Sequence, residues 1–153
     1  MRAPTRQHGI SMIEVLITLG IIAVLAGVMM PGMSSMIASQ GMKNGASDLY
    51  STLLRARSEA IKRNADITVR PATGGWAAGW TIANPNDSTK PLESHGALPN
   101  AVVTGPSSVV YTGSGRLRAA TSPEFDFSAP NTANERCLSI DLSGRPNMQR
   151  TGC

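Results

Sequence analysis

Residues that commonly carry out catalysis are scarce in this chain. Its 153 residues include two histidines, two cysteines and only six aromatic residues. His8 lies near the N-terminus, and His95 stands alone in a stretch flanked by Gly and Pro, where we expect an exposed loop. No phosphate-binding loop or metal-ligand cluster is evident, and Gly113-Ser114-Gly115 lacks the spacing of a nucleophile elbow. We therefore expect neither an enzyme nor a cofactor or metal site.

Charge is also limited and nearly balanced. The chain has 14 Lys and Arg against 10 Asp and Glu, a formal net charge of +4. Arg2 and Arg6 precede the first apolar run, so the remainder carries 12 basic residues against the same 10 acids. This balance does not by itself indicate nucleic acid as a partner. The length suits one folded domain plus an anchor.

What the chain does have is one long apolar run, Ile10–Met30, whose only strongly polar member is Glu14. As a helix this run is about 31 Å long, enough to cross the hydrocarbon core of a bilayer. A carboxylate in such a segment is costly and indicates a function. A cleaved secretory signal fits poorly because no small-residue cleavage site ends the run. Composition leaves a plain membrane anchor open.

The start of the run, Gly9-Ile10-Ser11-Met12-Ile13-Glu14, resembles the class III signal of type IV prepilins and type II secretion pseudopilins. The resemblance implies that a prepilin peptidase cuts between Gly9 and Ile10 and methylates Ile10. It also implies that Glu14, the fifth mature residue, meets the N-terminal amine of a neighbouring subunit. Such pairing would remove most of the cost of a carboxylate in a low-dielectric setting. Pro31 falls where these proteins commonly place a helix-loosening proline.

The same resemblance implies an organisation in four parts. Residues 1–9 would be the leader, 10–31 a transmembrane and filament-core helix, 32–64 its amphipathic continuation, and 65–153 a β-rich periplasmic domain. The protein would cross the bacterial inner membrane once and then enter a pilus or pseudopilus. Its implied partners are the prepilin peptidase/methyltransferase, other minor and major pilins or pseudopilins, and the inner-membrane assembly platform.

Beyond Pro31 an apolar stripe predicts an amphipathic helix. Its members recur at spacings of three and four residues: Met42, Ala46, Leu49, Leu53, Ala56 and Ala60. We expect this stripe to pack on the domain's own sheet. Pro31, Gly32, Gly41 and Gly45 predict loosening near the start of this helix, and residues 64–66 should end it.

Short β-prone runs separated by turns follow the helix. We expect strands at 67–70, stopped by Pro71, at 76–83, around Phe125 and Phe127, and at 137–142, with a polar loop at 84–91. Residues 101–104 and 109–112 form a candidate pair around Gly105-Pro106. One long helix followed by strands is typical of an α+β domain.

Cys137 and Cys153 lie close together near the C-terminus. If the segment after Pro31 is exported, they can pair in an oxidising compartment. A zinc site would need further Cys or His ligands nearby. We expect a disulfide that restrains the C-terminal tail.

A narrower resemblance extends over most of the chain after Gly9. Residues 53–64 are similar to the signature helix of the GspH/FimT family, Gly75-Trp76 and Gly79-Trp80 to its next strand, and Ser143-Gly144-Arg145 to its C-terminal turn. This family groups minor pseudopilins of type II secretion with minor pilins of type IV pili. It implies a type IV pilin-like α+β fold, a long hydrophobic N-terminal helix packed on an antiparallel β-sheet domain.

The C-terminal cysteines and basic segment look more like a type IV minor pilin than a pseudopilin. The resemblance then implies a subunit that primes or caps the filament and supports twitching motility, adhesion or DNA uptake. The alternative is a minor pseudopilin of a type II secretion system. The charges on the helix could simply form a solvated face with pairs such as Arg55–Glu59; they are Arg55, Arg57, Glu59, Lys62 and Arg63.

A subgroup of FimT-like minor pilins binds DNA through a Gly-Arg-x-Arg motif near the C-terminus. Here Gly144-Arg145 has no second arginine until Arg150, whereas Gly115-Arg116-Leu117-Arg118 matches the motif earlier, in an expected hairpin. Arg116, Arg118, Arg145 and Arg150 are therefore candidate contacts to DNA phosphates. Acidic residues share the region and no aromatic residue lies beside these arginines to stack a base. DNA binding remains an alternative.

Overall fold

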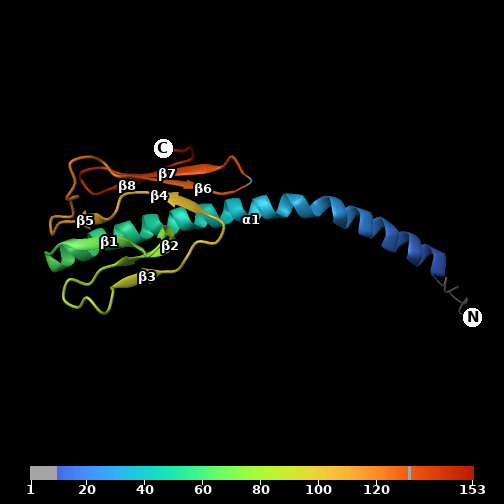
Figure 1. The fold of residues 1–153 in the computed structure, drawn as a ribbon, viewed down its shortest axis with the longest axis horizontal. Coiled ribbons are helices and arrows are strands. Elements are labelled where there is room, and N and C mark those ends of the chain that lie inside the picture. Colours follow the sequence, from blue (N-terminus) through green and yellow to red (C-terminus); the bar gives the residue numbers. More distant parts are fainter. Residues whose placement is uncertain (1–9, 131) are drawn as a thin grey trace, which may run out of the picture. The chain divides into compact units, whose positions relative to one another are not determined.

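A computed structural model describes residues 10–130 and 132–153, without the side chains of residues 28–32. The chain divides into two compact units, Met1–Ser34 and Ser35–Cys153. The helix α1, Met12–Arg63, belongs to both units, and all strands belong to the second (Figure 1). Each unit is considered on its own below.

In the first unit, α1 begins with a capped first turn. The Ser11 hydroxyl accepts a hydrogen bond from the backbone N–H of Ile13 at 3.2 Å, as expected of an N-cap serine. Glu14, three residues after the cap, has the spacing of a capping box and lies near the positive end of the helix dipole. Within the residues that the structure describes, no helix is both long and apolar enough to cross a membrane. The expected span includes residues 28–31, whose side chains lie outside the described residues.

In the second unit, α1 buries the predicted apolar stripe completely. Met42, Ala46, Leu49, Leu53, Ala56 and Ala60 all have no exposed surface. Gly41 and Gly45, where we expect a weaker helix, are both helical, and their effect on helix stability stays a prediction. Gly45 has a packing reason: a Cβ there would lie 2.5 Å from Cδ1 of Leu98.

The helix ends where the sequence predicts. Asn64 adopts a left-handed backbone conformation, with φ of 47°. The N–H of Ala65 bonds the carbonyl of Ala60 at 3.2 Å, and the N–H of Asn64 bonds that of Ile61 at 3.2 Å. This pair of bonds is a Schellman motif, which satisfies carbonyls that the helix end would leave free.

The first sheet contains β1 (Ile67–Ala72), β2 (Gly75–Ile82), β3 (Glu93–His95) and β5 (Val109–Tyr111), in the order β3-β2-β1-β5. All neighbouring strands are antiparallel. The predicted stop at Pro71 is wrong, because β1 continues to Ala72 with a register shift after Pro71. The irregular register at this point accommodates the proline, which cannot donate a ladder hydrogen bond.

The second sheet contains β4 (Val102–Thr104), β6 (Glu124–Ser128), β7 (Glu135–Ile140) and β8 (Pro146–Gln149), in the order β4-β6-β7-β8. The predicted pairing of 101–104 with 109–112 is wrong, since β4 pairs with β6 and β5 pairs with β1. The Gly105-Pro106 connection therefore passes between sheets. Gly105 lies so close to Phe125 that a Cβ would meet its ring at 2.5 Å.

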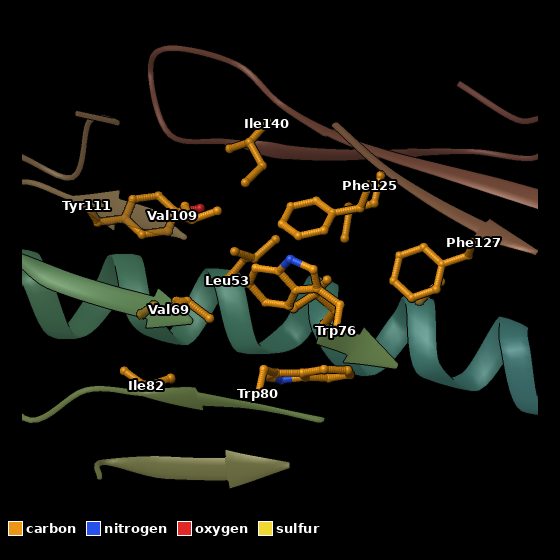
Figure 2. Packing of buried hydrophobic residues seen from close by; sticks show 14 of the residues in the cluster. Leu53, Val69, Trp76, Trp80, Ile82, Val109, Tyr111, Phe125, Phe127 and Ile140 are labelled. Carbon is orange, nitrogen blue, oxygen red and sulfur yellow. The ribbon is translucent and has the colours of Figure 1, made fainter. Parts of the chain in front are cut away.

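The core lies between α1 and the two sheets and uses most of the scarce aromatic residues. Trp80, Tyr111, Phe125 and Phe127 are fully buried, and Trp76 is 3% exposed. The Trp76 and Phe125 rings meet edge to face at 4.8 Å, which joins β2 of one sheet to β6 of the other (Figure 2). The Trp76 indole N–H donates to the carbonyl of Pro106 at 2.7 Å.

Candidate functional site

The predicted processing and assembly residues lie in the first unit. Gly9 and His8 are outside the described residues. Ile10 is 77% exposed, and Glu14 is exposed in the first turn of α1. Their apolar neighbours along α1 are also exposed: Ile13, Leu16, Ile17, Ile21 and Ile22 each show more than half of their surface. Cleavage after Gly9, methylation of Ile10 and loosening at Pro31 stay predictions.

The structure brings together two turns that carry the candidate arginines. One turn, residues 112–118, contains Arg116 and Arg118, and the other, residues 141–145, contains Arg145. The N–H of Leu117 donates to the carbonyl of Leu142 at 3.3 Å, so the turns are in direct contact. Arg118 also bonds back to Val110 at 2.9 Å, which agrees with the expected hairpin.

Arg57, on α1, joins both turns to the helix. Its Nε donates to the carbonyl of Gly115 at 3.0 Å and its Nη2 donates to the carbonyl of Ser143 at 3.2 Å. Sequence reasoning missed this role and grouped Arg57 with the solvated charges. Residue 57 follows Ala56 of the buried stripe, so its position at the edge of the buried face was the available signal.

Gly144 is required where the two turns touch. Its φ is 85°, and a Cβ there would collide with the carbonyl oxygen of Gly115. Beside it lies Tyr111, whose hydroxyl is buried and has no hydrogen-bond partner among the described residues. Burial raises the pKa of Tyr111 above its ordinary value, against the opposing effect of the nearby Arg57 charge.

The four candidate arginines have different surroundings. Arg118 pairs with Asp66 at 2.5 Å and Arg145 with Asp141 at 3.4 Å. Arg116 is exposed and forms no ion pair within the described part of the chain. Arg150 follows the far end of β8 from Arg145, so the structure groups three of the four and separates Arg150.

Asp141 organises the second turn. Its carboxylate accepts hydrogen bonds from the Ser143 hydroxyl at 2.5 Å and from the Arg145 backbone N–H at 3.0 Å. These bonds, the Ser143 bond foremost, lower the pKa of Asp141 to about 2. Because Asp141 neutralises Arg145 locally, this turn offers less positive charge than its sequence indicates.

The helix charges pair differently from the predicted Arg55–Glu59 contact, which is wrong. Glu59 instead pairs with Arg63 at 2.6 Å and Lys62 at 3.9 Å. The hydrogen bond from Arg63 lowers the pKa of Glu59. Arg55 pairs with Glu93 of β3 at 3.0 Å, because that strand lies beside this face of α1.

His95 is part of a polar cluster in β3, so the prediction of a loop is wrong. Its ring stacks on Trp80 with centroids 4.1 Å apart. Its Nδ1 faces the carbonyl of Gly96 at 2.8 Å and its Nε2 faces the carboxylate of Asp48 at 3.3 Å. The cluster borders a cavity of about 300 Å³.

The predicted disulfide between Cys137 and Cys153 is confirmed. Cys137 is buried in β7, and Cys153 lies in the C-terminal tail, where its N–H approaches Asp126 at 3.4 Å. The bond fastens this tail to the second sheet. In the described residues no group of three or more His, Cys, Asp or Glu side chains could hold a metal ion.

A helix with an exposed apolar start, packed through its later turns on antiparallel sheets, defines a type IV pilin-like protein. Two family models match the sequence: "Type II transport protein GspH" over residues 45–144 and the "Prokaryotic N-terminal methylation motif" over residues 4–30. The chain belongs to the GspH family of pilin-like proteins. This family consists of structural pilins and pseudopilins.

Known proteins agree with this assignment. Pilin-like protein PilA1 of Thermus thermophilus is 34% identical over 94 residues, which cover 60% of this chain and 58% of PilA1. Minor pilin FimU of Pseudomonas aeruginosa matches with a TM-score of 0.61 and 23% identity, over 70% of this chain and 91% of FimU. Minor pseudopilin EpsH of Vibrio cholerae matches with a TM-score of 0.56 and 14% identity, over 71% and 95%. These two likenesses establish the pilin-like fold.

Proposed function

We propose that this chain is a minor pilin of a type IV pilus. A prepilin peptidase would remove residues 1–9, and residues 10–31 would hold the mature protein in the bacterial inner membrane, with residues 65–153 in the periplasm. The subunit would then enter the filament or the complex that primes its tip. The observation that carries this proposal is the apolar, exposed start of α1, joined in one chain to a folded GspH-family domain.

The exposed apolar side chains of the first unit need a lipid or protein environment that shields them from water. Leu16 is 58% exposed and Val24 69% exposed, and similar neighbours surround them. Large contiguous apolar patches are unusual on soluble monomers and indicate protein or membrane contact. Lipid before assembly, and helices of other subunits afterwards, would both cover these side chains.

A second feature supports helix packing by α1 within the folded unit. One exposed face of the helix, which we call the uncharged face, carries no charged residue over seven turns: Ile37, Gln40, Asn44, Ser47, Ser51, Leu54, Ser58 and Ile61. Its spacing of three and four residues is that of a helix-packing seam.

Four of the five polar side chains of the uncharged face, those of Gln40, Asn44, Ser47 and Ser51, are already hydrogen-bonded within the helix. Gln40 donates to Asn44 at 2.9 Å, and the hydroxyls of Ser47 and Ser51 donate to backbone carbonyls one turn earlier at 3.1 and 3.0 Å. Covering these groups would therefore leave few donors unsatisfied. This supports a neighbouring helix as the partner of this face.

Glu14 is proposed to select the assembly site. After cleavage, Ile10 would carry a free ammonium close to it in sequence. A carboxylate entering a low-dielectric filament core is stable only when paired, so Glu14 would favour docking next to another subunit's amine. We expect Glu14→Ala to be processed and inserted normally but to be depleted from filaments. Glu124→Ala, a charge-matched change in the folded domain, should assemble; equal assembly of both variants would refute this role.

Processing is tested by intact-mass and N-terminal analysis of the membrane-extracted protein, with and without reductant. The proposal requires a chain that begins at methylated Ile10 and gains two hydrogen atoms on reduction. A chain that still begins at Met1 in cells that have the peptidase would indicate an ordinary membrane-anchored domain instead of a processed pilin. A start beyond Pro31 would indicate a removed signal peptide.

The alternative machine is a type II secretion system, in which this chain would be a minor pseudopilin. The family model and EpsH favour this reading, whereas FimU and PilA1 favour a pilus. A deletion strain separates them. Loss of surface pili and twitching with normal secretion of exoproteins supports our proposal, and the opposite pattern overturns it.

DNA binding is a further alternative, centred on Arg116 as the exposed arginine without an ion pair in the described turns. If it is correct, Arg116→Ala/Arg118→Ala should lose salt-sensitive DNA retention, and Arg145→Ala/Arg150→Ala should lose less because Arg150 lies apart. A purified chain that retains no DNA at low salt would end this alternative.

A further inference from the structure

A cavity of about 280 Å³ lies on the outer face of the first sheet, away from α1. Its lining comprises Arg70, Thr81, Ala83, Asn84, Ser88 and Pro91. Arg70 of β1 and Thr81 of β2 are cross-strand partners, so both side chains rise from the same face. Their neighbours in register, Val69 and Ile82, point the other way into the core.

The polar loop 83–92 forms one wall of this cavity, and hydrogen bonds at its ends and within it stabilise its conformation. At its start the N–H of Ala83 donates to the carbonyl of Thr68 at 2.8 Å, and at its end the N–H of Leu92 donates to that of Ile82 at 2.9 Å. Within the loop, Asp87 accepts bonds from the hydroxyl and the N–H of Thr89 at 2.6 and 2.9 Å. The only acid of the loop is therefore occupied locally.

The lining is rich in donors and contains no carboxylate. Arg70 forms no ion pair within the described residues, whereas Arg55, Arg63, Arg118 and Arg145 each have an acidic partner. The side-chain Oδ1 of Asn84 accepts a hydrogen bond from the backbone N–H of Asn86 at 3.1 Å, which leaves the side-chain N–H groups of Asn84 to donate elsewhere. Hydroxyls of Thr81 and Ser88 complete the set.

We propose that this cavity, which we call the Arg70 pocket, binds the phosphate group of a small ligand. The exposed guanidinium of Arg70, which is part of the lining, can bind two oxygens at once, and charge-assisted bonds of this kind are among the strongest in proteins. The lining also includes hydroxyl and amide donors from β2 and the loop, which are groups that bind a tetrahedral oxyanion. The volume is just below the usual range for ligand pockets, so a free phosphate or a sugar phosphate fits and a larger ligand does not.

This inference is independent of the machine to which the subunit belongs. The test uses the full processed chain in detergent, titrated calorimetrically with inorganic phosphate, a hexose phosphate and the same hexose without phosphate. We expect saturable binding of one phosphate or hexose phosphate per chain and none of the neutral hexose. Tighter binding of the hexose phosphate would identify a phosphorylated sugar, and equal binding would identify phosphate itself; both support the Arg70 pocket.

Variants locate the site. Arg70→Gln should weaken phosphate binding by about tenfold or more, because it removes charge-assisted bonds. Arg70→Lys keeps the positive charge but loses the two-pronged guanidinium, so its phosphate affinity should lie between those of the unaltered chain and of Arg70→Gln. Arg55→Gln removes the same charge from an arginine outside the pocket, whose side chain is 61% exposed, and should bind phosphate within about twofold of the unaltered chain. Tryptophan fluorescence checks that each variant is folded.

Three results would overturn the proposal. They are no saturable phosphate binding, an equal loss of phosphate binding in the Arg70→Gln and Arg55→Gln variants, and neutral hexose binding as tightly as hexose phosphate. The second result would indicate only general attraction of anions to a basic chain, and the third a neutral sugar site.

Discussion

Arg57 should contribute more to stability than any exposed charge on α1. Replacing it with methionine keeps most of the apolar stem but removes two hydrogen bonds from a charged donor, to the carbonyls of Gly115 and Ser143. Such bonds are typically worth about 1.5–3 kcal/mol each. Because the side chain is half-buried, water can partly replace them, and we expect Arg57→Met to cost about 2–3 kcal/mol in total.

The assay is equilibrium and thermal unfolding of the full chain in mild detergent, followed by tryptophan fluorescence. Trp76 and Trp80 are the only tryptophans and both lie in the core of the second unit, so the signal reports this unit alone. For a unit of about 120 residues, 2–3 kcal/mol corresponds to a fall in Tm of about 8–12 °C.

Arg55→Met is the matched control. Arg55 lies on the same helix and pairs with Glu93 at 3.0 Å, but its side chain is 61% exposed. Exposed ion pairs typically contribute about 0–1 kcal/mol. If the Arg57 and Arg55 variants lose equal stability, the argument that Arg57 holds the two turns on the helix is wrong. Arg57→Lys should recover less than half of the loss, because lysine cannot reach two divergent carbonyls with one planar group.

The remaining predictions concern the turns and the tail. Cys153→Ser should lower the free energy of unfolding by about 3 kcal/mol, as expected for a loop with a sequence separation of 16; denaturant unfolding that equals that of the unaltered chain would contradict this. Gly144→Ala should cost about 3 kcal/mol or more, whereas Gly75→Ala, with a similar φ of 93° and open space at Cβ, should cost only about 1 kcal/mol; equal midpoints in thermal unfolding would refute the proposed clash. The lowered pKa of Asp141 stabilises the fold above about pH 4, and this contribution is lost as pH falls through about 2; an Asp141→Asn variant should show a shallower acid dependence of Tm, and an unchanged slope would count against the role of Asp141.

Local patterns were sufficient for the elements that have a regular period. The three-four spacing of the stripe from Met42 to Ala60 identified the buried face of α1, and every member is fully buried. Alternation around Phe125 and Phe127 identified β6, whose two rings point into the core. In both cases one face of the element packs against the core, so the spacing of apolar residues in the sequence directly predicts which residues are buried.

The pairing between strands was harder to predict from the sequence. Residues 101–104 and 109–112 are separated by a Gly-Pro turn signal, which also suits a hairpin, yet they belong to different sheets. The choice depends on Phe125 and Trp76, which pack against Gly105 from distant parts of the chain. Strands β3 and β8 were missed because both are short edge strands, with little alternation to detect.

The sites show the same division. The sequence identified four candidate arginines, but not the ion pairs of Arg118 with Asp66 and of Arg145 with Asp141. It placed Arg57 among solvated charges, because nothing nearby in sequence shows that two loops cross its path. Ion pairs between elements depend on which strand lies beside which helix face, as for Arg55 and Glu93.

The sequence alone determined the class of this protein. The Gly9–Glu14 motif, the apolar run that follows it and the helix of residues 53–64 are each continuous in the sequence, so they can be recognised without knowledge of the fold. It also determined the buried face of α1 and anticipated the disulfide. Only the tertiary structure decided how the eight strands divide into two sheets within the described residues, how Arg57 fastens two turns, and where Arg70 is left without an acid. Those outcomes depend on contacts between residues far apart in the chain, whose energies appear only when the whole core has formed.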